Sequence, residues 1–168
     1  IGASHYLYDH LRLLQHYSSG NIKDLAKKIT LDNAMLNYLD NTQNNANNPN
    51  ENYAREFLEL FTITKGEQIG EGDYSTYTED DVIMAAKVFS GFKTKLDRTI
   101  IDPDTGIPMG RISVNQHDQS TKTFSHAFDN YQLAGGTDEN TIISELHEFV
   151  DMIFDKEATA RAYVSKLY

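Results

Sequence analysis

The sequence has no cysteine and no tryptophan, and only three of its 168 residues are proline. Without cysteine, disulfides, thiolate nucleophiles and cysteine-ligated metal centres are excluded. No run of 18 apolar residues occurs, so no transmembrane segment is predicted. The Walker, G-x-S-x-G and G-x-G-x-x-G motifs are also absent, which leaves P-loop, serine hydrolase and dinucleotide chemistry without their usual signatures.

Positive charge is scarce, with 15 Lys and Arg against 25 Asp and Glu, a formal net charge of −10. Such a chain repels a phosphate backbone, so nucleic acid is not expected as a partner. Hydrophobic residues make up 39% and charged residues 24%, which is ordinary globular usage. We expect a single helical domain over residues 1–168, and the start at Ile1 indicates an excerpt of a larger protein.

Apolar residues recur every three or four positions through most of the chain and predict about six or seven helices. The first helix is expected to start at Ser4 and the second to follow Gly20. The expected starts of the others are Thr30 or Asp32, Asn50, Thr78, Thr137 and Asp155. Residues 41–52 contain seven Asn and are expected to form a loop. Residues 99–101 and 112–114 flank a turn at 102–106 and predict a β-hairpin. The predicted fold is therefore mainly α, a multi-helix array with a small β-hairpin before the last two helices.

One predicted helix carries a dense set of charged side chains. Glu51, Arg55 and Glu59 lie four residues apart and share one face, with Asn52 and Glu56 on the neighbouring stripe. Such residues are typical of a solvated ladder of ion pairs. The alternative is a site in which the arginine orients a substrate or shifts the pKa of one acid.

A second polar group, His117 and Asp118, lies in a segment without helical pattern and is followed by Lys122. A histidine beside an acid can serve as a base or as one corner of a metal site, for which Glu56 is the further candidate ligand. The alternative is ordinary hydrogen bonding. No cofactor is predicted, and a divalent metal is left open.

Two other patterns are incomplete. His147-Glu148-Phe149-Val150-Asp151 has Asp where the H-E-x-x-H metalloprotease motif needs a second His, so this polar trio is expected to face water. Asp102-x-Asp104-x-Gly106 begins like a calcium loop but lacks the closing Glu, which favours a turn.

The segments Ala34-Met35-Leu36-x-Tyr38-Leu39-Asp40-Asn41 and Pro49-Asn50-Glu51-Asn52-Tyr53-Ala54-Arg55-Glu56-Phe57-Leu58-Glu59-Leu60-Phe61-Thr62 resemble the hallmark region of the bacterial domain-of-unknown-function family 1800. Further similar stretches follow in family order, among them Tyr77-Thr78-Glu79, Ser90-Gly91-Phe92, His117-Asp118 and Lys166-Leu167-Tyr168. The resemblance implies an exported, periplasmic or cell-surface protein, and it supplies no activity.

The resemblance also suggests that both polar groups point inward and neutralise one another, because an unpaired buried charge is costly. This expected cluster contains Asn50, Glu51, Asn52, Arg55, Glu56, Glu59, His117 and Asp118. Our first hypothesis is a structural or interaction module, clasped by Arg55 and His117, whose partner is another protein or the rest of the same chain. The alternative is a hydrolase using Glu56 or Glu59 with His117 and Asp118, and the third is glycan binding through the Asn-rich loop and Tyr residues.

Overall fold

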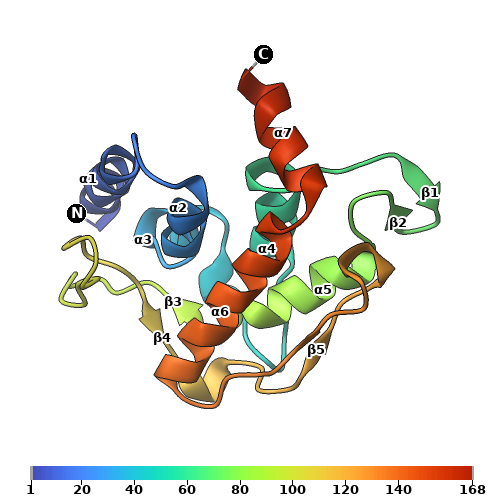
Figure 1. Cartoon of the computed structure of the whole chain (residues 1–168). Helices are drawn as coiled ribbons and strands as arrows, with labels where there is room; N and C mark the ends of the chain where they lie inside the picture. Colours follow the sequence, from blue (N-terminus) through green and yellow to red (C-terminus); the bar gives the residue numbers. More distant parts are fainter. Residues whose placement is uncertain (1, 168) are drawn as a thin grey trace.

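The computed structural model describes residues 2–167, and their secondary structure is mainly helical (Figure 1). The seven α-helices are α1 Gly2–His16, α2 Ile22–Ile29, α3 Asn33–Tyr38, α4 Asn52–Glu56, α5 Glu79–Val88, α6 Glu139–Phe154 and α7 Glu157–Leu167. A π-helical turn, η2 (Phe57–Phe61), continues α4, and short 3₁₀ turns η1, η3 and η4 cover Asn41–Gln43, Val114–Gln116 and His126–Phe128. The mainly α prediction is confirmed.

The strands form three separate two-stranded antiparallel sheets. They pair β1 (Gln68–Gly70) with β2 (Asp73–Tyr74), β3 (Phe92–Lys93) with β4 (Arg111–Ile112), and β5 (Lys122–Thr123) with β6 (Gln132–Leu133). All three precede the last two helices.

The pairing of the predicted hairpin was wrong. Ile112 pairs with Phe92, whereas residues 99–101 contribute only a bridge from Ile101 to Pro108. The reason is a tertiary contact, because the amide of Gly110 donates to the carbonyl of Leu31 at 2.7 Å and draws this strand toward the α2–α3 connection. The predicted turn at 102–106 does form.

Helix starts follow side-chain capping, which replaces the missing backbone acceptors of the first turn. Thr78 caps α5, as the sequence predicted, and the structure adds a reciprocal capping box with Asp81. Of the two candidates for α3, Asp32 is the cap. Thr137 was wrong for α6, whose cap is Asp138.

Three other predicted helix starts were also wrong. Ser4 lies inside α1, which covers Gly2–His16. The cap position of α4 is Glu51, and the side chain of Asn50 instead accepts from the amide of Asn52 at 3.0 Å. Asp155 ends α6, and α7 begins at Glu157. These shifts of one or two residues leave the order of the helices unchanged.

An aromatic core joins the central helices. The ring of Phe89 lies 5.2 Å from that of Phe57 and 5.4 Å from that of Phe149, and Phe124 lies 5.6 Å from Phe149. Phe89 directly follows α5, Phe57 belongs to η2, Phe149 to α6 and Phe124 to the segment after β5, and all four are fully buried. Figure 1 shows α6 running across the middle of the molecule, where it contacts both α2 and α5.

Candidate functional site

Arg55, the centre of the first predicted polar group, projects from α4 toward the start of α5. Its guanidinium donates two hydrogen bonds to the carboxylate of Glu79, at 3.0 and 2.8 Å, and a third to Glu51 at 3.1 Å. These hydrogen bonds, chiefly the pair with Glu79, raise the pKa of Arg55 and lower the pKa of Glu79. The side chains of Arg55 and Glu79 are 35% and 37% exposed, so the ion pair lies at the surface.

The expected clasp between Arg55 and His117 was wrong. All ion-pair partners of Arg55 lie on α4 and α5 or next to their starts, and none of them contacts His117. Glu56 and Glu59 are partly exposed and form no ion pair with the described residues. The physical reason is that Glu79, one of three acids in the first turn of α5, is an acceptor that sequence spacing could not place beside Arg55.

His117 instead belongs to a second, fully buried cluster, which we call the buried triad and define as Lys122, Glu145 and His117. The Nζ of Lys122 lies 2.6 Å from Oε1 of Glu145, and the Nε2 of His117 lies 2.8 Å from Oε2 of the same carboxylate. All three side chains are 0% exposed. The Glu145 carboxylate also accepts from the amide of Gly136 at 2.6 Å. Oε1 of Glu145 has no hydrogen bond and is balanced by the ion pair with Lys122, which a carboxylate buried to this degree needs.

The other ring nitrogen of His117 anchors the triad to the end of α5. Its Nδ1 donates to the carbonyl of Ser90 at 2.8 Å, since a carbonyl can only accept. The Ser90 hydroxyl also accepts from the amide of Asp118 at 2.8 Å. Gly91 has a φ of +80°, and a Cβ there would stand 2.6 Å from the carbonyl oxygen of Ser113, so only glycine fits this close approach.

Asp118 is not a hydrogen-bond partner of the His117 imidazole. Its carboxylate accepts from the amide and hydroxyl of Ser120, while its carbonyl accepts from Lys122. Burial alone raises the pKa of Asp118, but the Ser120 hydrogen bonds and the charges of Lys122 and Lys87 hold it below its ordinary value. Asp118 therefore stabilises its own loop.

The candidate metal ligands are not assembled. Both ring nitrogens of His117 are engaged, and Glu56 is no partner of the triad. Among residues 2–167, no three His, Asp or Glu side chains are arranged to hold a metal ion.

The Asn-rich loop is largely committed to the fold. Asn41 and Asn44 are buried and donate to the carbonyls of Phe89 and Ala86, respectively, at 3.0 and 2.8 Å. Asn50 and Asn52 likewise donate to backbone carbonyls of the α3 end. These four amides tie the loop to neighbouring segments, whereas Asn47 and Asn48 at its tip stay exposed, and glycan binding stays an untested prediction.

Sequence reasoning missed Glu145 and the role of Lys122. Glu145 lies among Ile142, Leu146 and Phe149 on the apolar face of α6, and a charged residue at a core position was the available signal. Lys122 likewise precedes the buried Phe124 by two residues, which places both on one side of an extended strand.

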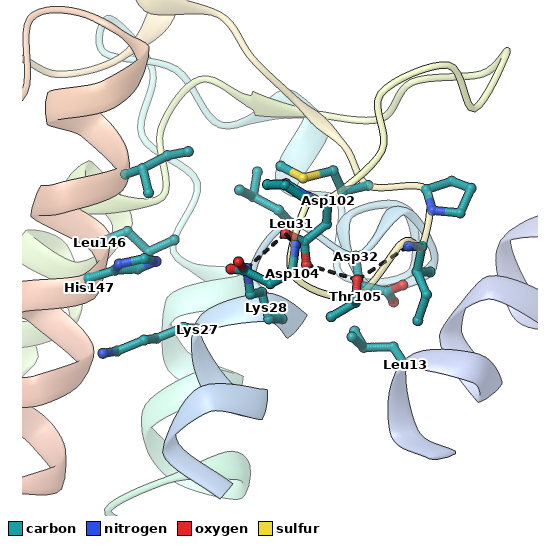
Figure 2. Close-up of a pocket in the computed structure, with 15 residues that line it drawn as sticks. Leu13, Lys27, Lys28, Leu31, Asp32, Asp102, Asp104, Thr105, Leu146 and His147 are labelled. Atoms are coloured by element: carbon teal, nitrogen blue, oxygen red, sulfur yellow. Dashed lines mark hydrogen bonds and ion pairs between the residues drawn. The ribbon is translucent and has the colours of Figure 1, made fainter. Parts of the chain in front are cut away.

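His147 was expected to face water and instead is half-buried in a pocket between α6, α2 and the loop 102–109 (Figure 2). The other two polar residues of the incomplete metalloprotease motif do not line this pocket. Glu148 is exposed, and Asp151 forms ion pairs with Lys23 and Lys27. His147 lies at the edge of the apolar face of α6, next to the buried Leu146, and is therefore partly covered.

The helices, small sheets and two ion-pair clusters define a mainly helical domain with a polar network inside its core. In the described part of the chain, no helix has both the length and the apolar character needed to cross a bilayer. The family model described as "Protein of unknown function (DUF1800)" matches residues 2–168, and the chain belongs to this family. Comparisons with curated proteins and with solved structures gave no match.

Proposed function

We propose that this domain is an interaction module, in which the buried triad has a structural role and an apolar groove binds a helix of a protein partner. The observation that supports the proposal most strongly is the groove itself. It has a volume of about 510 Å³ and is bordered by α1, α2, α3, η2 and α7. Apolar side chains that line it, among them Ile22 and Leu60, are 44% and 56% exposed.

The apolar surface extends from the groove along α1. Leu7 and Leu11 are 56% and 55% exposed, one helical turn apart. Large exposed apolar patches on soluble domains mark interaction sites, and a groove between helices is the usual receptor for an amphipathic helix.

Charge around the groove favours an acidic partner helix. None of the described residues that line it is acidic, and its polar members are His10 and Lys166. The only carboxylate on the described side chains of α1, Asp9, is 0% exposed and held by Arg98 at 2.7 Å. In a chain of net charge −10 this local lack of acids is unusual. It would attract acidic residues flanking the apolar face of a partner.

The predicted catalytic residues support the structural half of the proposal. The His117 side chain is fully buried, and both of its ring nitrogens have partners. Glu56 lies on α4 and Glu59 on η2, and neither is a partner of His117. No observation favours the hydrolase hypothesis. Export to the cell surface or periplasm stays a prediction from the family resemblance.

The test is selection of helical peptides from a displayed library on the folded protein. We expect enrichment of peptides with apolar residues at i, i+3, i+4 and i+7 and with acidic flanks. Binding of a purified selected peptide should weaken at least about tenfold in Leu60→Asp and in Ile22→Asp, which place a charge in the groove.

Leu96→Asp is the matched control, because Leu96 is 76% exposed and does not line the groove. It should bind the selected peptide like the wild type. A selected pool without an amphipathic consensus, or a peptide that binds Leu60→Asp as tightly as the wild type, would refute the proposed groove.

A further inference from the structure

The pocket beside His147 lies away from the apolar groove and has a different character. It holds about 180 Å³ and is enclosed by α6, α2, Leu13 of α1 and the loop 102–109. Its inner wall is apolar and includes Leu31, Ile107 and Leu146, all buried. An apolar cavity of roughly 150 Å³ is known to take a benzene-sized molecule, so this volume fits one aromatic ring.

Most polar groups around the pocket already have partners. Lys28 donates to Asp102 at 2.8 Å and to Asp104 at 2.6 Å, and Lys27 is paired with Asp151 at 2.9 Å. The lysine ammonium groups are therefore neutralised by the protein. They are not free to bind an anionic ligand.

His147 is the exception. Figure 2 shows its ring extending from α6 toward Asp104 and Lys28, and it forms no hydrogen bond or ion pair with the described residues. Burial, with the nearby charges of Lys27 and Lys28, lowers the pKa of His147 below its ordinary value. The neutral imidazole offers a nitrogen that accepts a hydrogen bond from a ligand.

Outside the apolar part, a polar mouth of about 320 Å³ continues the pocket. Both share Lys27, Lys28, Asp104 and His147, and the mouth adds Tyr17 and Asp24. The carboxylates that line the two parts, those of Asp24, Asp32, Asp102 and Asp104, outnumber the two lysines. At the mouth itself Asp24 and Asp104 balance Lys27 and Lys28, and the surplus carboxylates line the inner part. The net negative charge of the pocket as a whole favours a cation and disfavours an anion.

We propose that this pocket binds a small aromatic molecule with a protonated amine, whose ring fills the apolar part between α2 and α6. The ammonium group then lies at the mouth, where it donates to His147 and faces Asp104. The size of the cavity, the unpartnered imidazole and the net negative charge of the pocket lining each select one feature of this ligand.

Three probes of equal ring size separate these contributions: benzylamine, benzyl alcohol and benzoate. Each is titrated into the whole chain and followed by the backbone amide shifts of residues 27–31, 102–109 and 143–147. We expect benzylamine to bind most tightly and benzoate roughly tenfold more weakly or worse, since its charge has the wrong sign. Benzyl alcohol should lie between them.

Two variants test the geometry, with Ser144→Ala, an exposed neighbour on α6, as the matched control. His147→Phe keeps the ring volume and removes the acceptor, so benzylamine should bind several-fold more weakly. Asp104→Asn should reduce the preference for benzylamine over benzyl alcohol; the Asp104 side chain is 71% exposed, so folding is retained.

The proposal would be overturned if benzylamine shifted backbone amides over the whole surface and not in the three segments named above. Benzoate binding as tightly as benzylamine, or an affinity for benzylamine unchanged in His147→Phe, would also overturn it. Localised shifts that follow the expected order of probes and weaken in both variants would support it.

Discussion

Arg55 shows how exposure decides what an ion pair contributes. Its two hydrogen bonds to Glu79 form the planar, bidentate contact for which guanidinium and carboxylate are matched. Both side chains are more than one third exposed, so water and salt screen the attraction that a buried pair would keep. Removing one member of this exposed pair should therefore cost far less stability than removing one charge from the buried triad.

We expect Arg55→Ala to lower the free energy of unfolding by about 1 kcal/mol or less, because the pair is exposed and its partners return to solvent. Urea denaturation followed by circular dichroism measures this change. The effect should shrink further at high salt, where screening has already weakened the pair. A loss of several kcal/mol would show that the guanidinium is buried in solution, as the sequence had predicted.

At the scale of elements, the buried triad fastens a segment with little regular structure to two helices. His117 and Lys122 flank a loop between η3 and β5, and Glu145 holds both from α6. Ser90, just after α5, holds His117 from the other side. The loop therefore depends on side-chain pairing more than on strand hydrogen bonds.

Lys122→Met should lower the free energy of unfolding by on the order of 3 to 5 kcal/mol, because the buried Glu145 carboxylate loses the positive charge that balances it. The double variant Lys122→Met/Glu145→Gln removes both charges and should lose less than the sum of the single losses. A double-mutant cycle from chemical denaturation gives the coupling energy.

The exposed pair of Arg161 and Glu157 is the matched control for this cycle. Both side chains are 77% exposed, so Arg161→Met and Glu157→Gln should leave the unfolding midpoint unchanged. If the triad variants were strictly additive, its members would be independent and the structural role would be wrong.

The elements also show what the sequence could and could not predict. Local signals were sufficient for Thr78 and reduced the cap of α3 to two candidates, one of which, Asp32, is the cap, because a cap acts within three residues. The triad brings together Lys122 and Glu145 from distant positions, and no periodicity reports such a pairing. The β3–β4 pairing of Phe92 with Ile112 likewise depends on where the loop between them lies against α2 and α3.

For the whole molecule, two histidines give stability opposite dependences on pH. The hydrogen bond that His10 donates to the Asp32 carboxylate raises the pKa of His10, against the effect of burial. Burial and the charges of Lys27 and Lys28 lower the pKa of His147. The stabilisation from His10 is complete below its unfolded pKa of about 6.5 and is lost as pH rises through its folded pKa. His147 acts in reverse, since stability falls as pH drops from about 6.5 through its lowered folded pKa.

Substitution of each histidine should therefore change the pH profile in opposite directions. His10→Gln should destabilise the protein more at about pH 5.5 than at about pH 8, and His147→Gln should improve relative stability only on the acidic side. Denaturation across this range measures both profiles, with His5→Gln as control, because His5 is exposed on the same helix as His10. Parallel profiles for all three variants would show that neither Asp32 nor the α2 lysines act on these imidazoles in solution.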